Sequence, residues 1–359
     1  MKKFSVDANI CKAATLPAEF YRSPAVFELV KEKIFTRTWL YALDTNLVNR
    51  AKQVQPLVLL PGILDEPILF TCDTALGLHC LSNVCTHRAK LVVEEAGSCT
   101  QLRCDYHGRC FYLDGTFKRM PAFEKAENFP SPADNLPKIP FAEWLNLLFV
   151  SLDPQVPFSE MVQPIQERLS WLPLDTLEYD EKGSKDYYVN ANWALYCDNY
   201  LEGLHIPFVH PALNQALDFK QYEYELFPYC NLQLGIAGAD EPCFDIPKGH
   251  PDHGRKVYAY YYWLFPNLMF NFYPWGLSLN SIEPLSQEKT LVRFRTYKFK
   301  EAKFDYTVNQ LDKTEMEDEY VVESVQKGIQ SRFYRAGRFS PSMEQCVHHF
   351  HQLIGRFLD

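Results

Sequence analysis

The first part of the chain carries apolar residues on one side of a potential helix. Between residues 17 and 43, large apolar side chains recur at intervals that fit the helical repeat, and the charged run 31–33 falls between them. The apolar face comprises Phe20, Phe27, Val30, Ile34 and Trp39. The pattern predicts that residues 17–43 are helical, within an N-terminal helical segment, 1–43, that packs against another part of the chain.

From about residue 44 the helical repeat gives way to short runs rich in β-branched and aromatic residues. Turn sequences such as Pro61-Gly62 and Asp114-Gly115 separate these runs. The predicted strands cover residues 54–60, 67–72, 78–84, 101–103, 109–113 and 144–150. A proline-rich stretch at 129–140 is expected to cross the surface as a loop. Residues 44–153 are therefore expected to form a small all-β domain.

The remainder, residues 154–359, mixes both patterns. A helical connector is expected at 154–183, and a strand follows at 185–193. Aromatic-rich strands are expected at 222–234 and 257–298, with turns at 280–286 and 287–288, and helices at 307–329 and 342–357. This order predicts an α+β protein whose antiparallel sheet is covered on one face.

Composition narrows the class of protein. The hydrophobic content of 47% fits a globular protein with a full core, and the formal net charge of −9 argues against binding to nucleic acid. The apolar run at 257–265 is too short to span a membrane, and the N-terminus does not resemble a secretory signal. We therefore expect a cytoplasmic protein that binds no membrane. The 11 cysteines favour metal binding or buried thiols over a disulfide framework.

Two Cys-and-His pairs stand out in the β domain. Cys85 and His87 lie in the sequence CTHR, and Cys104 and His107 lie in CDYHG. Two thiolates and two imidazoles can hold a zinc ion, or a [2Fe–2S] cluster with cysteine on one iron and histidine on the other. The spacing CxH followed by CxxH resembles the Rieske signature. Ala89 and Arg109 depart from it, since glycine and tryptophan are usual there, but neither is a ligand position.

A second group of metal-binding residue types lies in 192–211, NWALYCDNYLEGLHIPFVHP. Asp198, Glu202 and His205 fall on one face of a helix. His210 does not fit that face, but Pro207 can break the helix and turn His210 toward the same point. Two histidines and one carboxylate would form a facial triad, which leaves positions open on Fe(II).

The carboxylate of such a triad is expected on the helix at 307–329. Val322, Val325 and Ile329 are predicted to form its inward stripe, and Asp318 continues that stripe. Asp318 is therefore the first choice for the ligand, with Glu317 second, whereas Glu319 points elsewhere.

Together these features resemble the catalytic α subunits of Rieske non-heme iron oxygenases over essentially the whole chain. The resemblance implies a Rieske domain at 44–153 and a helix-grip catalytic domain at 154–359, against which residues 1–43 pack. It implies that His205, His210 and Asp318 bind iron. Glu202 would be the bridging carboxylate, which reaches a cluster histidine of the neighbouring subunit. Asn199 would be the amide near iron and Asp198 a supporting residue, whereas His348, His349 and His351 would pack the C-terminal helix.

The resemblance also implies a reaction and partners. The cluster would pass electrons to Fe(II), which would activate dioxygen as co-substrate and oxidise a small organic molecule. The chain has no Gly-rich dinucleotide fingerprint, so a separate NAD(P)H-dependent reductase is expected, acting directly or through a ferredoxin. The family's arrangement implies a homotrimer.

The substrate class is open at this point. The chain most resembles choline and carnitine monooxygenases, and aromatic side chains can hold a quaternary ammonium group. The candidates are Tyr258, Tyr260, Tyr262, Trp263, Phe265, Phe270, Phe272 and Trp275, although core packing explains most of them. The alternatives are an aromatic-ring-hydroxylating dioxygenase, a stand-alone electron carrier and a non-catalytic, zinc-stabilised ligand-binding module.

Overall fold

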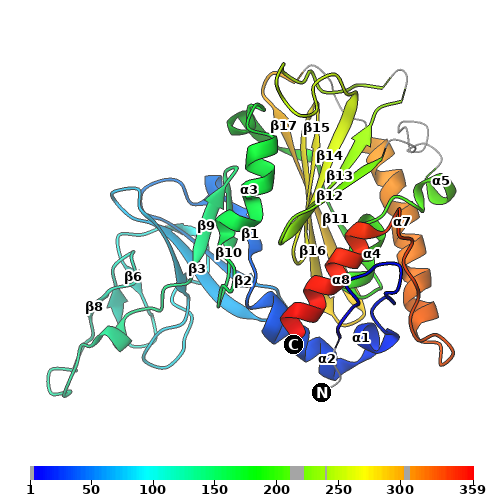
Figure 1. Cartoon of the computed structure of the whole chain (residues 1–359). Coiled ribbons are helices and arrows are strands. Elements are labelled where there is room, and N and C mark those ends of the chain that lie inside the picture. The colour runs from blue at the N-terminus through cyan, green and yellow to red at the C-terminus, as the bar shows by residue number, and fades with distance from the viewer. Residues whose placement is uncertain (1–3, 211–221, 239–240, 303–307) are drawn as a thin grey trace. The chain divides into compact units, whose positions relative to one another are not determined.

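The computed structural model describes residues 4–210, 222–238, 241–302 and 308–359. It contains two compact units, shown in Figure 1. One unit is the continuous stretch Trp39–Pro154. The other combines Met1–Thr38 with Gln155–Asp359. The chain therefore leaves the larger unit once, builds the smaller one, and returns.

The N-terminal helical prediction is confirmed at its start and wrong at its end. Helices α1 (Ala18–Arg22) and α2 (Pro24–Val30) continue into a π-helical turn, Lys31–Phe35. Strand β1 (Leu40–Asp44) then pairs with a strand of the smaller unit, which accordingly begins at Trp39 rather than at residue 44. Leu40 and Leu43 are both buried because a β-bulge lies between them. Their three-residue spacing therefore imitates a helix.

The smaller unit is all β, as predicted. It contains a four-stranded sheet, a sheet in the order β6-β7-β8, and a sheet in the order β1-β10-β9. The strands are β2 (Gln53–Leu59), β3 (Glu66–Cys72), β4 (Leu78–Ser82), β5 (Gly97–Ser98), β6 (Leu102–Arg103), β7 (Cys110–Phe111), β8 (Phe117–Arg119), β9 (Phe141–Trp144) and β10 (Leu147–Val150). The single strand predicted at 144–150 is in fact part of the hairpin β9–β10. Leu145 and Asn146 form its turn with positive φ angles, at which a two-residue hairpin loop reverses the chain.

The larger unit is built on one seven-stranded antiparallel sheet in the order β11-β17-β16-β15-β14-β13-β12. The strands are β11 (Leu177–Val189), β12 (Glu223–Leu226), β13 (Cys230–Ile236), β14 (Val257–Leu264), β15 (Leu268–Tyr273), β16 (Gly276–Ser286) and β17 (Lys289–Phe299). The helical connector predicted to residue 183 ends much earlier, because α3 covers Phe158–Arg168 and β11 begins at Leu177. β11 is an edge strand with many charged residues, which is typical of edges and hides the strand pattern.

The turn predicted at 280–286 is also wrong. Those residues belong to β16, which pairs with β17 along its length. Asn280 and Ser281 are buried within the sheet, and the Ser278 hydroxyl donates a hydrogen bond to the Asn280 side chain. Turn-forming residue types therefore lie in a central strand because side-chain hydrogen bonds satisfy their polar atoms.

Four helices complete the larger unit among the described residues after β11: α4 (Trp193–Tyr200), α5 (Ile206–Val209), α7 (Val308–Ile329) and α8 (Gln345–Leu358). α4 packs against α7 and β16, whereas α8 packs against β12, and Figure 1 shows α7 and α8 beside the sheet. Trp193 anchors α4, since its buried ring contacts the rings of Phe35 and Phe350. No helix in the described ranges is long and apolar enough to cross a membrane.

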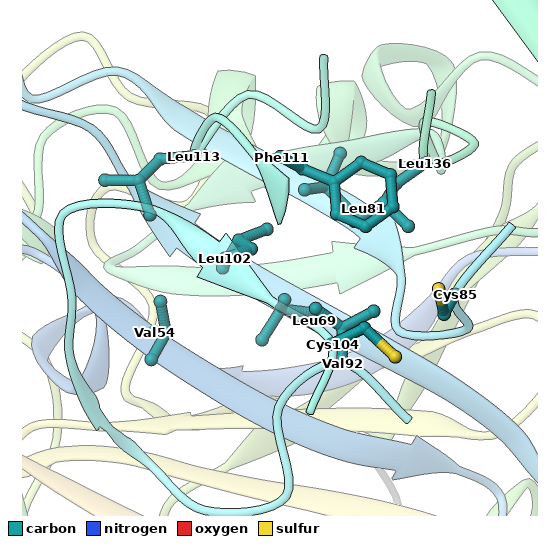
Figure 2. Packing of buried hydrophobic residues seen from close by; sticks show 10 residues of the cluster. All are labelled: Val54, Leu69, Leu81, Cys85, Val92, Leu102, Cys104, Phe111, Leu113 and Leu136. Atoms are coloured by element: carbon teal, nitrogen blue, oxygen red, sulfur yellow. The ribbon is translucent and has the colours of Figure 1, made fainter. Parts of the chain in front are cut away.

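The small core of the β unit ends in two loops of matching backbone geometry. Cys85 and Cys104 belong to this core, which Figure 2 shows. The amide of Cys85 donates to the carbonyl of Lys90, and the amide of Cys104 donates to the carbonyl of Arg109. In each loop the fifth residue, Ala89 or Gly108, donates its amide back to the cysteine carbonyl and has a positive φ, 57° and 73° respectively. The two loops are therefore built alike, except that the first carries a side chain where the second has none.

The left-handed conformation of Ala89 gives a stability prediction. A side chain in that region costs roughly 1–2 kcal/mol, whereas glycine adopts it freely. Ala89→Gly should therefore stabilise the protein by up to about 1 kcal/mol, after allowing for the greater entropy of glycine in the unfolded chain. Urea denaturation followed by circular dichroism measures the change.

A matched control is Ala96→Gly, because Ala96 is also exposed in the same unit but has no positive φ. This substitution should lower stability by about 0.4–1 kcal/mol. Equal losses in both variants would contradict the assignment of strain to Ala89.

Candidate metal centres

The first candidate centre lies on the two matching loops. The thiols of Cys85 and Cys104 are buried, whereas His87 is partly exposed and His107 is exposed. The two imidazoles lie side by side, with 3.1 Å between their Nδ1 atoms and 4.7 Å between ring centroids. Burial raises the pKa of Cys85, and the Cys104 thiol contributes to the rise, as expected of two thiols that lie close together. Each loop thus contributes one inner sulfur donor and one outer nitrogen donor.

The spacing of these donors distinguishes a cluster-binding site from a site for a single metal ion. In the described part of the chain, only His205, His210 and Asp318 bring three ligand atoms within 4.8 Å of one another. The four donors of the β unit form a thiol pair and an imidazole pair instead. This arrangement fits a binuclear iron–sulfur cluster with one pair on each iron better than a tetrahedral zinc. Burial lowers the pKa of His87, and His107 and Arg88 lower it further, which favours the neutral, metal-binding imidazole.

The second candidate centre depends on an interruption in the predicted helix. α4 ends at Tyr200, and a short turn precedes α5, with His205 as the residue that starts it. Pro207 is therefore not the helix breaker that the sequence suggested, because it occupies the first turn of α5, where a missing N–H costs nothing. The break comes before His205 and places it close to His210. Their ring centroids are 5.1 Å apart.

Each histidine is held by a carboxylate on its far side. His205 Nδ1 lies 2.6 Å from Glu202 Oε1, and His210 Nδ1 lies 2.8 Å from Glu317 Oε2. Both Nε2 atoms then face Asp318 Oδ1, at 3.6 Å from His205 and 3.0 Å from His210. A carboxylate that accepts a hydrogen bond from Nδ1 fixes the tautomer, so that Nε2 carries the lone pair. The donor set of two imidazoles and one carboxylate fits a mononuclear Fe(II) with open positions.

The electrostatics of this centre favour a cation. Burial lowers the pKa of His210, but the hydrogen bonds and charges of Asp318 and Glu317 more than compensate, and the pKa is raised. Positive charge is therefore stabilised at this point. The same field favours a divalent metal ion.

The structure separates the acidic residues of α7 by role. Val322 and Ile329 are buried as predicted, but Val325 is 44% exposed, and Gln326 takes its place in the inward stripe. Asp318 lies on that stripe, and the adjacent Glu317 reaches His210 from the other side of the ring. The prediction that Glu319 points elsewhere agrees with its absence from the described metal group, and burial raises the pKa of this carboxyl.

Asp198 and Asn199 lie outside the group. Asp198 accepts a hydrogen bond from the Tyr21 hydroxyl at 2.7 Å and lies 2.8 Å from Nε2 of His351. His351 Nδ1 accepts the amide of Leu16, so Nε2 is the donor to Asp198. Asp198 thereby joins α4 to both ends of the chain. Asn199 is half-buried on α4 and is absent from the described metal group.

Two features of these centres were missed by the sequence analysis. Glu317 was considered only as a second-choice ligand, and no sequence signal showed that it would hold the far nitrogen of His210. Arg109 was seen as a departure in loop packing, whereas its guanidinium is buried and paired with Asp134 at 2.7 Å. A buried arginine needs an acidic partner. The one sequence signal for this pair was therefore the presence of Asp134 in the proline-rich stretch that follows.

Comparisons with known proteins identify the family of this chain. A family described as "Ring hydroxylating alpha subunit (catalytic domain)" matches residues 174–359, and "Rieske [2Fe-2S] domain" matches residues 46–130. The chain is 28% identical to the carnitine monooxygenase oxygenase subunit of Escherichia coli K12, covering 97% of this chain and 95% of that protein. It is 27% identical to the chloroplastic choline monooxygenase of Beta vulgaris, covering 94% and 76% respectively.

Solved structures show the same fold. A quaternary ammonium Rieske monooxygenase superposes with a TM-score of 0.79 at 24% identity, covering 99% of this chain and all of the other. Naphthalene 1,2-dioxygenase from Rhodococcus gives a TM-score of 0.72 at 19% identity, covering 96% and 94%. The chain therefore belongs to the ring-hydroxylating α-subunit family of Rieske non-heme iron oxygenases, whose cofactors are a Rieske [2Fe–2S] cluster and a mononuclear iron.

Proposed function

We propose that this oxygenase oxidises a small quaternary ammonium compound, with Fe(II) held by His205, His210 and Asp318. The observation that carries the iron assignment is the convergence of their ligand atoms within 4.8 Å. When bound, the iron activates dioxygen with electrons delivered by the Rieske cluster. Cys85, His87, Cys104 and His107 are the proposed cluster ligands.

The chain's own contribution to the reaction is orientation. Glu202 and Glu317 accept hydrogen bonds from the two Nδ1 atoms, and the rings cannot turn without breaking them. Glu202 also accepts the backbone amide of His205, which fixes the turn between α4 and α5. Asp318, a half-buried carboxylate on a long helix, completes the triad from a different element.

Two kinds of observation support a quaternary ammonium substrate: the relatives of the chain and its aromatic residues. Two of the relatives are named as choline and carnitine monooxygenases, and each matches nearly the whole of this chain. Six of the suggested aromatics fill the core and are fully buried: Tyr260, Tyr262, Trp263, Phe265, Phe270 and Phe272. Tyr258 remains partly exposed and contacts Tyr273, which stacks on Trp275 with 5.1 Å between ring centroids. Such rings are suited to a cationic trimethylammonium group.

A substitution in the triad tests the iron assignment. His205→Ala should reduce the mononuclear iron from about one per subunit to near zero and abolish oxygenation, because two ligands hold Fe(II) weakly. The cluster absorbance, its electron paramagnetic resonance signal and its acid-labile sulfide should remain. His253→Ala is the matched control, since His253 is exposed in the same unit and, in the described part of the chain, its ring bonds only to a nearby backbone carbonyl. Loss of iron and cluster together would argue against two independent centres.

A substrate comparison tests the quaternary ammonium assignment. Choline and carnitine should drive coupled oxygen uptake when a surrogate reductase and NADH are present, and NADH without the reductase should not. The uncharged carbon isostere of choline, 3,3-dimethylbutanol, should be about five- to thirtyfold poorer, because a cation–π contact worth about 1–2 kcal/mol is lost. Turnover of naphthalene with no response to the ammonium compounds would instead identify an aromatic-ring dioxygenase.

The subunit arrangement is part of the proposal. We place the cluster of one subunit beside the iron of its neighbour in a homotrimer, with Glu202 as the bridge and an external reductase as the electron source. A solved relative is described in terms of inter-subunit electron transfer. In this chain, Leu204 and Phe208 are exposed on either side of His205, and Tyr106 is exposed beside His107. Exposed apolar side chains next to ligand candidates of both centres support an interface between them.

Complementation tests this arrangement. His205→Ala and Cys104→Ser should each be inactive alone, since one lacks iron and the other lacks the cluster. Co-expressed in equal amounts, they should recover about a quarter of the wild-type activity, because that share of random neighbours joins a good cluster to a good iron site. Sedimentation should give three chains per particle. No recovery from verified mixed trimers would rule out transfer between subunits.

A further inference from the structure

Arg109 is a fully buried cation beside the proposed cluster loops. Only 2% of its side chain is exposed. Its guanidinium carbon lies 5.0 Å from the ring centroid of Phe117 and 5.6 Å from those of Phe111 and Phe129. The Nε atom has no hydrogen-bond partner in the described part of the chain. Burying such a charge is costly, so an arginine kept here calls for a physical explanation.

The partner of Arg109 joins both ligand loops. Nη2 of Arg109 donates to Asp134 Oδ1 at 2.7 Å and to the Asp134 backbone carbonyl at 3.0 Å. The same carbonyl accepts the hydroxyl of Thr86 at 2.8 Å. Thr86 lies between Cys85 and His87, and Arg109 follows His107 and Gly108. Asp134, from the proline-rich stretch, therefore ties the first ligand loop to the second.

Asp134 is itself held in place as an anion. Its Oδ2 accepts the amide and the hydroxyl of Ser131, at 2.7 and 3.0 Å. Burial opposes ionisation of Asp134, but the hydrogen bonds from Ser131 and Arg109 outweigh it and lower the pKa. Arg109 and Asp134 therefore form a fixed ion pair. The backbone carbonyl of Arg109 also accepts the amide of Cys104 and closes the second ligand loop.

We propose that Arg109 is a positioning residue of the cluster site, which clamps the two ligand loops through Asp134 and raises the reduction potential of the cluster with its buried charge. The inference rests on the proposed ligand assignment and goes beyond it. Reduction adds one electron, and hence one negative charge, to the cluster. A nearby positive charge in a medium of low dielectric constant stabilises that state, and a nearby negative charge destabilises it.

Two neutralising substitutions give opposite predictions for the cluster. Arg109→Met removes the positive end and should shift the midpoint potential to a more negative value. Asp134→Asn removes the negative end, leaves Arg109 charged, and should shift it to a more positive value. Potentials are measured on the purified holoprotein by mediated redox titration, followed by circular dichroism and electron paramagnetic resonance. A purely structural role would not give shifts of opposite sign.

Further variants keep the experiment decisive if one of these two variants incorporates little cluster. Arg109→Lys retains the positive charge but loses the forked donors of the guanidinium. Its cluster potential should therefore stay closer to the wild type than that of Arg109→Met, and the protein should lose its cluster at a lower temperature than the wild type. Lys118→Met is the matched control, because Lys118 is an exposed cation on β8 of the same β unit. Solvent screens its charge, so its loss should leave the potential unchanged.

The outcomes separate this inference from the ligand assignment. Wild-type protein without a cluster signal would overturn the assignment itself. A wild-type cluster, with Arg109→Met and Asp134→Asn shifting in the same direction or not at all, would overturn the inference alone. Equal shifts for Arg109→Lys and Arg109→Met would overturn the part played by the charge.

Discussion

The proposed iron site depends on the two carboxylates that hold the Nδ1 atoms of its histidines. Without Glu202 and Glu317, each imidazole could turn about its side-chain bonds or change tautomer, and Nε2 would not face Asp318. The three carboxylates also concentrate negative charge in a partly buried place. Such a cluster of like charges is unfavourable unless cations lie among them, which is the charge balance that a divalent metal supplies. Orientation and affinity therefore come from the same groups.

The proposed cluster site orients its ligands in a different way. Its loops are fixed by backbone hydrogen bonds between each cysteine and the residues four and five positions later, and by left-handed residues at Ala89 and Gly108. The thiols are anchored in the core of the β unit, and the histidines stand outside it. One centre thus relies on side-chain carboxylates, and the other on main-chain geometry reinforced by Asp134 and Arg109.

Features that depend on local spacing can be predicted from the sequence, whereas features that depend on distant parts of the chain cannot. The pairs Cys85–His87 and Cys104–His107 are local, and so is the choice of Asp318 from the helical repeat of α7. The roles of Glu317 and Asp134 depend on residues 107 and 25 positions away, which no local pattern shows. The errors in secondary structure have the same origin. β1 resembled a helix because a bulge changed its spacing, and β16 resembled a turn because buried hydrogen bonds satisfied its polar side chains.

As the proposed bridge between subunits, Glu202 has one methylene more than an aspartate would have, and this length affects what the bridge can reach. Both of its oxygens already bind His205, one at the ring and one at the backbone amide. A carboxylate oxygen has two acceptor positions, so a donor from a neighbouring cluster histidine can still be accepted. Aspartate three residues before the histidine would have one methylene less and could not extend as far beyond the turn. In the proposed trimer, glutamate therefore allows the same residue to fix its own histidine and to reach a partner, provided that the turn between α4 and α5 remains rigid.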